Sequence, residues 1–214
     1  AVPATSGYQT MLKNIGSIEN QGYELSIESD NLTGPFSWTT AFNISFNRNK
    51  VLELGGEDYK EMAEGDGHIK TGSVRRLIAG EPIGVFYGYR FDGIFQNEEE
   101  CKQQTSSASP IGVGLRRYKD LNGDGKVDAA NDREILGDAN PKFFGGLTNT
   151  FAYKGFELNV FLQYSYGNKI LNYNAMELEN PTGGQNAYAD MVNRWTPENP
   201  SNIYPKATTN RAIL

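Results

Sequence analysis

The chain has 214 residues, a formal net charge of −6 and a pI near 4.9. This acidic balance excludes a nucleic-acid partner, because neutralising phosphates requires a basic face. The sequence has no run of about 18 apolar residues, which excludes a transmembrane helix and leaves a membrane β-barrel open. Its mean hydropathy is −0.55 although 12% of its residues are aromatic, and this combination indicates many half-buried strands.

The two ends of the sequence favour a segment from within a longer protein. The opening stretch AVPATSGYQT has no initiator methionine, basic region or apolar core, so it does not match a signal peptide. The closing stretch YPKATTNRAIL ends on an apolar residue without a terminal element. Cys101 is the only cysteine, which excludes an intrachain disulfide.

Several segments alternate apolar and polar residues with a period of two, which is typical of β-strands. In the segment 36–47, Phe36, Trp38 and Phe42 share one face, while Ser37 and Thr39 share the other. The longer segments reach about ten residues, the length that a membrane-spanning strand requires. The predicted strands are YELSIES (23–29), FSWTTAFNISFN (36–47), VFYGYRFD (85–92), FFGGLTNTFAY (143–153) and FELNVFLQYSYG (156–167), with a weaker one at 74–78.

The connections between these strands alternate between short and long. Short turns are predicted at 30–35, 79–84 and 153–155, and long polar segments at 47–72, at 96–141 and from 168 onward. This parity predicts an all-β fold, an antiparallel transmembrane β-barrel segment with short turns on one side and long loops on the other. A soluble β-sandwich also alternates apolar and polar residues, so it remains an alternative. Short helices are expected only within the loops, at 97–104 and 190–200.

One loop, KDLNGDGKVDAANDRE, carries oxygen-bearing side chains at the spacing of a calcium loop. Gly125 falls at the sixth position, where a sharp turn is needed, but the twelfth position is Asn131 rather than an acid. No helical pattern flanks the loop, so it resembles an isolated, dockerin-like loop that would hold a structural Ca²⁺. Asn, Gly and Asp also favour turns, so a metal-free turn is the alternative. The candidate ligands are Asp120, Asn122, Asp124, Lys126 through its carbonyl, Asp128 and Asp132.

The sequence gives no support for an enzyme. His68 is the only histidine and lies in a polar stretch, whereas a catalytic triad needs a base held in a packed site. A zinc site lacks sufficient Cys and His ligands. The acidic stretch EDYKEMAEGD (57–66) is predicted to be a solvated loop face.

Polar and aromatic residues of the third long loop could contact a sugar or a peptide, although loop packing explains each of them as well. These residues do not identify a substrate site. They are Tyr173, Asn174, Tyr188, Asn193 and Trp195.

Three blocks together resemble the SusC/RagA family of TonB-dependent outer-membrane transporters. They are NIGSIENQGYELSI, GEPIGVFYGYRFDGIFQN and RYKDLNGDGKVDAANDREILGDANPKFFGGLTNTFAYKGFELNVFLQYSYGNKILN. The third block is the most specific, because GDANPKF leading into a Tyr-Lys-Gly hairpin is not a generic β-sequence. The resemblance covers nearly the whole chain.

The resemblance implies that residues 1–214 form part of one transporter barrel in the outer membrane of a Gram-negative cell, in contact with its lipid. Such barrels have about 22 strands around a plug, and this chain would supply about six to eight strands, without the plug, the TonB box or the final strands. Family members pair with a SusD-like lipoprotein and import oligosaccharides or peptides with energy passed through the TonB complex. The alternative is a soluble calcium-binding β-domain, acting as an adhesin or a carbohydrate-binding module, which would be soluble without detergent.

Overall fold

The computed structural model describes residues 16–62, 74–179 and 186–208. The chain divides into two compact units. We call Ala1–Ala63, Arg75–Val85 and Gly137–Lys169 the sheet unit, and Glu64–Val74, Phe86–Leu136 and Ile170–Leu214 the loop unit. His68 and the last part of the acidic stretch, residues 63–66, lie outside the described residues.

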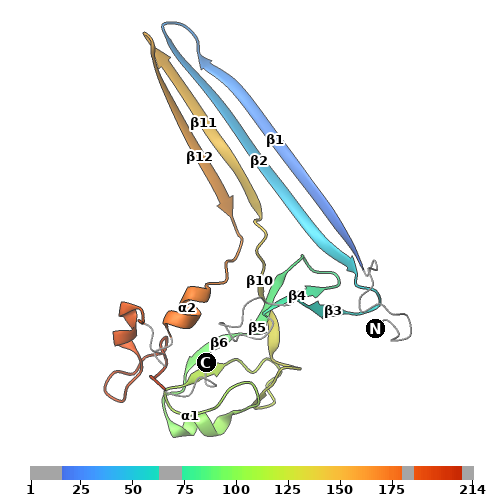
Figure 1. Cartoon of the computed structure of the whole chain (residues 1–214), viewed down its shortest axis with the longest axis vertical. Helices are drawn as coiled ribbons and strands as arrows, with labels where there is room; N and C mark the ends of the chain where they lie inside the picture. Colours follow the sequence, from blue (N-terminus) through green and yellow to red (C-terminus); the bar gives the residue numbers. More distant parts are fainter. Residues whose placement is uncertain (1–15, 63–73, 180–185, 209–214) are drawn as a thin grey trace, which may run out of the picture. The chain divides into compact units, whose positions relative to one another are not determined.

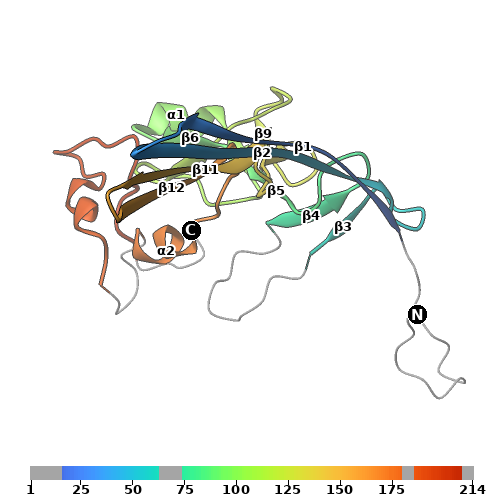
Figure 2. The same ribbon diagram turned by 90° about the horizontal axis from the view of Figure 1, so that it is seen from above.

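The sheet unit contains one long antiparallel sheet. Its strands are β1 (Ser17–Leu32), β2 (Phe36–Glu53), β11 (Phe143–Tyr153) and β12 (Phe156–Tyr166), paired in the order β1-β2-β11-β12. Figure 1 shows these four strands side by side, and Figure 2 shows β1 and β12 at the two edges of the sheet. The antiparallel prediction is confirmed, and the described residues contain four long strands where the resemblance implied about six to eight.

Both hairpins of this sheet turn tightly, as the sequence predicted. Residues 33–35 join β1 to β2, and two residues, Lys154 and Gly155, join β11 to β12. Lys154 has φ 46° and Gly155 has φ 84°. Positive φ at both central positions is the geometry of the two-residue hairpin turns whose twist matches that of the strands.

The strand β2 continues beyond its predicted end at Asn47 and reaches Glu53. The extension is held by chain segments that the sequence pattern treated as loops. Asn49 Oδ1 accepts the Ile83 N–H at 2.6 Å, and Val51 exchanges backbone hydrogen bonds with Glu81 and Gly80. Because these partners come from distant positions in the chain, local polarity alone could not reveal the longer strand.

A short hairpin, β3 (Tyr59–Glu61) and β4 (Arg75–Ile78), also belongs to the sheet unit. The strand predicted at 74–78 is confirmed by β4, whereas the prediction of an acidic loop face at 57–66 is wrong for β3. Arg76 explains the difference, since its guanidinium bonds to Glu61 and lies 4.3 Å over the ring of Tyr59. These contacts fasten the acidic segment to β4.

The loop unit consists of short elements. Its strands are β5 (Val85–Tyr89), which begins at the last residue of the sheet unit, β6 (Phe91–Ile94), β7 (Thr105–Ser106), β8 (Arg116–Tyr118), β9 (Lys126–Val127) and β10 (Arg133–Gly137). Its helices are α1 (Glu98–Gln103), α2 (Tyr173–Leu178) and the 3-10 turn η2 (Ala189–Asn193). Strand β6 pairs with β8, β7 with β9, and β5 with β10. No helix in the described ranges is long and apolar enough to cross a membrane.

The prediction of one long strand at 85–92 is wrong. The backbone changes partner within this stretch, because β5 pairs with β10 whereas β6 pairs with β8. The turn at 79–84 therefore joins two short strands, β4 and β5, and is not a hairpin of the long sheet. The predicted helices at 97–104 and 190–200 are confirmed as α1 and, in shorter form, η2, while α2 was not predicted.

The loop unit has a small apolar core of its own. Ile94 and Phe95 are each 1% exposed, as is Val127, and Leu115 and Met191 are also buried. The Phe95 N–H donates to the Leu115 carbonyl, and the Gly114 N–H donates to the Phe95 carbonyl. Several short segments therefore share one core, which makes this unit more than an unstructured connection.

Candidate functional site

The long sheet has one apolar face and one polar face. Alternation along the strands and their register place every second residue of each strand on the same side. The apolar face carries Tyr23, Leu25 and Ile27 of β1; Phe36, Trp38, Thr40, Phe42, Ile44 and Phe46 of β2; Phe143, Gly145, Leu147, Asn149, Phe151 and Tyr153 of β11; and Phe156, Leu158, Val160, Leu162, Tyr164 and Tyr166 of β12.

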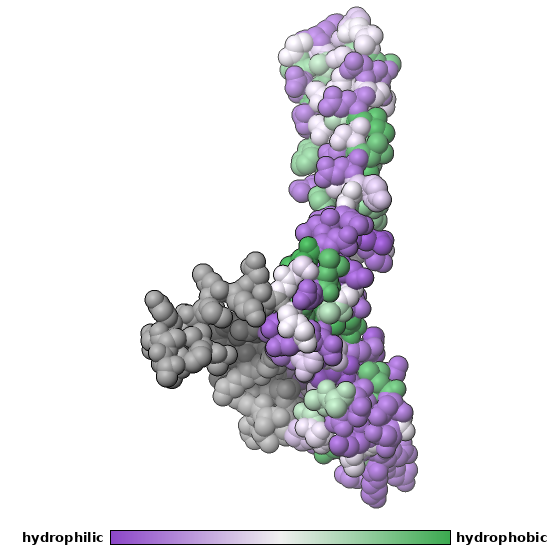
Figure 3. Space-filling view, turned by 90° about the vertical axis from the view of Figure 1, so that its right-hand side faces the viewer, coloured by the Kyte–Doolittle hydropathy of each residue, from purple (hydrophilic) through white to green (hydrophobic). Residues whose placement is uncertain are grey.

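Large apolar side chains lie exposed on this sheet. Phe156 and Tyr23 are each 82% exposed, and Leu158 is 60% exposed. Figure 3 shows hydrophobic side chains at the surface along the long sheet, beside hydrophilic ones. An exposed apolar surface of this extent marks contact with lipid or with another chain.

Aromatic residues gather at both ends of the apolar face. We call Tyr23, Phe46, Phe143 and Tyr166 the loop-side belt, and Phe36, Tyr153 and Phe156 the turn-side belt. The rings of Phe143 and Tyr166 lie 5.2 Å apart and those of Phe143 and Phe46 lie 6.0 Å apart. In the turn-side belt, the rings of Phe36 and Tyr153 lie 6.5 Å apart. Aromatic belts at both edges of an apolar band are typical of strands that cross a membrane.

The spacing between the two belts fits the thickness of a bilayer core. Phe36 and Phe46 lie ten positions apart on β2, which is about 33 Å along a strand at roughly 3.3 Å per residue. A strand tilted by about 40° then spans about 25 Å along the membrane normal, which is the height of the apolar band in outer-membrane barrels.

The opposite face of the sheet is polar, with mostly Ser, Thr, Asn, Gln and Glu side chains. The residues on it are Glu24, Ser26 and Glu28; Ser37, Thr39, Ala41, Asn43, Ser45 and Asn47; Phe144, Gly146, Thr148, Thr150 and Ala152; and Glu157, Asn159, Phe161, Gln163 and Ser165. A polar inner wall and an apolar outer wall are the alternation expected for a membrane barrel.

Polar side chains that interrupt the apolar face form a hydrogen-bond network within the sheet. Asn149 Oδ1 accepts from Trp38 Nε1 at 2.9 Å and from Thr40 Oγ1 at 2.7 Å. The Asn31 amide donates in turn to Thr40 Oγ1 at 2.6 Å. Because a polar group facing hydrocarbon is costly when it is unpaired, this network makes an amide tolerable on an apolar surface.

A glycine lets the two hairpins of the sheet pack closely. Gly145 of β11 faces Tyr164 of β12, and the Tyr164 hydroxyl donates to the Asn43 carbonyl of β2 at 2.7 Å. The tyrosine ring therefore lies across the glycine, where a Cβ would come within 2.6 Å of the hydroxyl oxygen. An aromatic side chain that covers a glycine in this way fixes the register of neighbouring strands.

The predicted calcium loop is a tight turn in which side-chain oxygens accept backbone N–H groups. Asp120 accepts from Gly123 and Gly125, both at 2.7 Å, and Asp124 accepts from Lys126 at 2.8 Å. Within the described ranges, no three His, Cys, Asp or Glu side chains are grouped so that they could hold a metal ion. The sequence prediction correctly located a carboxylate-rich turn, and its metal stays a prediction.

Asp132, the candidate closing ligand, is the most deeply buried acid of the loop and is 0% exposed. Its two carboxylate oxygens accept the N–H groups of Leu121 at 2.8 Å and Asp128 at 2.7 Å. It therefore joins the two ends of the loop directly. The one-residue displacement from the twelfth position places this acid where it can bond to both backbone segments.

Two ion pairs lie in and beside the loop. Lys126 Nζ lies 3.0 Å from Asp128 Oδ2, and this hydrogen bond is the main cause that lowers the pKa of Asp128, followed by the N–H of Asn131. Arg90 bonds to Glu134 and lowers the pKa of that carboxyl. Both carboxylates are therefore held in their charged forms.

The predicted contact residues of the third loop, Asn174 and Asn193 among them, lie in α2, in η2 or directly beside η2. Trp195 is half-buried, its Nε1 donates to Gln96 Oε1 at 3.0 Å, and it packs on Gly114. Tyr173 begins helix α2, and Tyr188 precedes η2. Trp195 thus helps to order the loop unit, and the sequence offered no signal for its partner 99 positions away.

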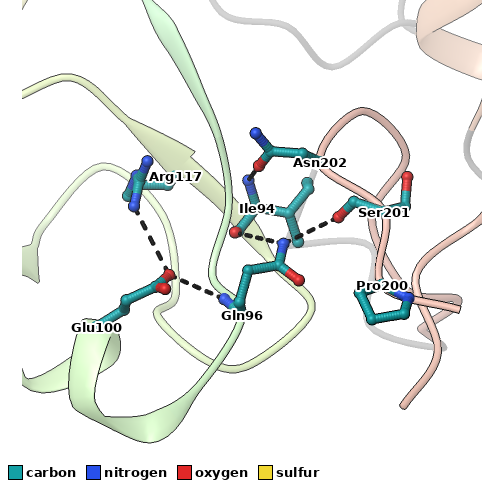
Figure 4. Close-up of a pocket in the computed structure, with 7 residues that line it drawn as sticks. All are labelled: Ile94, Gln96, Glu100, Arg117, Pro200, Ser201 and Asn202. Atoms are coloured by element: carbon teal, nitrogen blue, oxygen red, sulfur yellow. Dashed lines mark hydrogen bonds and ion pairs between the residues drawn. The ribbon is translucent and has the colours of Figure 1, made fainter. Parts of the chain in front are cut away.

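A pocket of about 390 Å³ lies in the loop unit. Ile94, Gln96, Glu100, Arg117 and the segment 200–202 line it, and Figure 4 shows their polar groups around the opening. No local sequence pattern indicates this pocket, because its walls come from chain segments about one hundred residues apart.

No protein-family model matches the chain. TonB-dependent receptor P3 of Formosa agariphila is 39% identical over 206 residues, which are 96% of this chain and 20% of the receptor. TonB-dependent receptor P26 of the same organism is 34% identical over 207 residues, with the same coverage. TonB-dependent receptor SusC of Bacteroides thetaiotaomicron is 29% identical over 165 residues, 75% of this chain and 15% of the receptor. The chain thus spans about a fifth of the length of the first two receptors.

Among solved structures, that of the RagAB peptide transporter matches 99% of this chain and 22% of the solved chain, with a TM-score of 0.72 and 20% identity. A sheet that is apolar on one side, polar on the other and bordered by aromatic belts defines a segment of an outer-membrane β-barrel protein. The similar proteins identify the family of outer-membrane proteins to which this segment belongs. The chain belongs to the SusC/RagA family of TonB-dependent receptors, as its sequence blocks predicted.

Proposed function

We propose that this chain is a wall segment of an outer-membrane transporter that imports glycans or peptides together with a SusD-like surface lipoprotein. The apolar face with its two aromatic belts carries the proposal, because it has the height of a bilayer core and no apolar layer of its own covers it in the described part of the chain. The similarity to TonB-dependent receptors supports import driven through TonB by the whole protein.

The polar face supports a role as the inner wall of a transport barrel. Side chains that face a water-filled interior can form hydrogen bonds there, whereas they would be costly toward lipid. In the described residues, the outer edges of β1 and β12 have no partner strand. Strands from the rest of the receptor would pair with these edges, because lipid does not tolerate an open edge.

The connections of the sheet indicate its direction in the membrane. Both hairpin turns lie at the same end of the sheet, and the chain leaves the other end for long segments. Outer-membrane barrels place short turns on the periplasmic side and long loops outside the cell. The loop unit would therefore be extracellular, where a surface lipoprotein and the incoming substrate are encountered.

Calcium binding by the 120–132 loop stays a prediction, and the proposed role of the ion is structural. Asp120, Asn122 and Asp124 keep the spacing of a calcium loop, and their carboxylate and amide oxygens are ligands of the kind that Ca²⁺ prefers. Each oxygen that accepts a backbone N–H still has a second lone pair for a cation.

The test uses the full-length receptor that contains this segment, in a host strain from which its gene has been deleted. Complementation should restore growth on a glycan or peptide source only when TonB is functional. Fractionation should recover the receptor in the outer membrane, and detergent should be required to purify it. Recovery as a soluble protein would contradict the proposal and favour the soluble calcium-binding β-domain.

A further inference from the structure

The pocket of the loop unit has the features of a binding site for a neutral sugar. We infer that it holds one sugar unit of a glycan at the extracellular surface of the receptor, an inference that rests on the proposed transport function. Its volume of about 390 Å³ falls within the range of small-ligand pockets, about 300–1,000 Å³. The lining combines two apolar side chains, Ile94 and Pro200, with amide, carboxylate and guanidinium groups.

Hydrogen bonds fix the walls of the pocket before any ligand arrives. Gln96 Nε2 donates to the Ile94 carbonyl at 2.9 Å and to the Ser201 carbonyl at 3.0 Å. Gln96 Oε1 accepts from Trp195 Nε1. One side chain thus ties the two distant segments together, and Figure 4 shows the bonds from Gln96 to Ile94 and Ser201. A rigid wall favours binding, because less side-chain freedom is lost.

Asn202 has one bonded end and one free end. Its Oδ1 accepts the Ile94 N–H at 2.9 Å, while its Nδ2 has no hydrogen-bond partner in the described part of the chain. Gly93, at φ 109°, makes the close approach possible, because a Cβ there would overlap the Asn202 amide. The amide oxygen is therefore structural, and the amide nitrogen remains available as a donor.

The charged groups on the other wall carry a negative excess. Arg117 Nε lies 3.2 Å from Asp92 Oδ2, and Arg117 Nη1 lies 3.6 Å from Glu100 Oε2. Two carboxylates thus surround one guanidinium, which leaves one negative charge in excess. This excess disfavours phosphate, sulfated and uronic ligands, because a like charge would be brought near an existing one.

The remaining groups match the hydroxyls of a neutral sugar. A hydroxyl both donates and accepts, so one hydroxyl can donate to the Glu100 carboxylate and accept from Arg117, and a neighbour can accept from Asn202 Nδ2. Pro200 can cover the C–H side of the ring, whereas the side chain of Ile94 is buried in the core of the loop unit.

The experiment measures equilibrium binding to the purified full-length receptor in detergent by isothermal titration calorimetry. The probes are neutral trisaccharides of glucose, mannose and xylose, with a sulfated trisaccharide and a tripeptide as comparators. Asn202→Asp keeps the oxygen that bonds to Ile94 and removes the free N–H₂ donor. It should weaken the binding of the tightest neutral trisaccharide by about tenfold, the effect of one lost charged or buried hydrogen bond.

Two substitutions of the same type on helix α1, one inside the pocket and one outside it, distinguish an effect of the pocket from a general effect of removing a negative charge. Glu100→Gln should weaken the same trisaccharide by about tenfold, while Glu99→Gln, on an exposed position outside the pocket, should leave binding unchanged. Equal binding by all variants, or binding of only the tripeptide or the sulfated sugar, would overturn the inference.

Uptake measurements keep the inference distinct from the proposed function. If the wild-type receptor imports a substrate but no pocket variant changes its binding, the sugar pocket is wrong and the transport function stands. If TonB-dependent uptake fails altogether, the transport function is wrong, and a trisaccharide affinity that depends on Asn202 and Glu100 would still support the pocket.

Discussion

The two units of this chain differ in where they place their apolar side chains. In the sheet unit, large apolar residues such as Tyr23 and Phe156 point outward and remain exposed. In the loop unit, Ile94, Phe95 and Val127 are turned inward and are almost completely buried. The difference supports the proposal that the apolar face of the sheet contacts lipid, whereas the loop unit buries its apolar side chains as a protein in water does.

The two units also differ in which groups accept the hydrogen bonds of their backbone N–H groups. The long strands satisfy their N–H groups through a continuous ladder, which is what a lipid environment requires. The loop unit instead satisfies many N–H groups with side-chain oxygens, such as those of Asp120, Asp128 and Asp132. Irregular backbone of this kind is accessible to water and tolerates local opening.

The largest expected effect comes from a charge on the apolar face of the sheet. Leu147 faces Phe42 and Leu162 midway between the two belts. Leu147→Arg should destabilise the folded full-length barrel by about 2–4 kcal/mol, because the guanidinium would lie near the bilayer midplane. Urea titration of the receptor refolded in phospholipid vesicles measures this change.

Thr148→Arg is the matched control, because it introduces the same side chain at the next position, on the polar face. It should change the unfolding free energy by less than about 1 kcal/mol. If both variants lost stability equally, the assignment of the two faces to lipid and to the barrel interior would be contradicted.

A smaller loss is expected where the two hairpins pack. In Gly145→Ala, the new methyl group would overlap the Asn43 carbonyl and press on the Tyr164 ring, which should cost about 1–3 kcal/mol. Tyr164→Phe keeps the ring and removes only the hydroxyl that donates to Asn43, so it should cost about 1 kcal/mol. The same urea titration compares them, and a larger effect of Tyr164→Phe than of Gly145→Ala would refute the close packing.

The long sheet could be predicted from sequence because its signal is local. Period-two alternation in 36–47 and 156–167 gives the apolar and the polar face directly, and the Lys154-Gly155 turn has its own residue signature. The end of β2 was misplaced because Asn49 and Val51 find their partners near residues 80–83. A polar side chain in a strand looks like a loop residue when its partner is far away in the sequence.

The loop unit was less predictable because its contacts are distant and its elements are short. The pattern at 85–92 correctly predicted extended backbone, but at Arg90 one strand ends and the next begins with a different partner strand. No local feature of the sequence marks that change. Likewise, the pocket depends on Gln96 meeting Ser201. Of the candidate sites, only the carboxylate-rich turn was apparent from sequence, because Asp and Asn bond to backbone a few residues away.

Acid should loosen the loop unit before it affects the sheet. Because Lys126 and nearby N–H groups hold the pKa of Asp128 below its ordinary value of 3.8, the stabilisation is complete above that pH and is lost as the pH falls through the lower, folded value. Pepsin cleavage within 120–132 should therefore accelerate between about pH 4 and pH 2. Asp128→Asn should remove most of this pH dependence, and an unchanged pH profile in that variant would contradict the role of the carboxylate.

The smallest expected effect is that of calcium, and it tests whether the loop unit relies on its own backbone alone. If Ca²⁺ binds the 120–132 loop, millimolar Ca²⁺ at neutral pH should slow proteolysis there by a few fold, because a ligand of the folded form opposes opening. EDTA should reverse this protection without changing the urea midpoint of the barrel. Asp124→Ala should abolish the calcium effect, whereas Glu99→Gln, outside the loop, should retain it. The rate of proteolysis could also be the same with Ca²⁺, with EDTA and in Asp124→Ala. That result would mean that the hydrogen bonds from backbone N–H groups to the carboxylates of Asp120 and Asp132 close the loop without a metal.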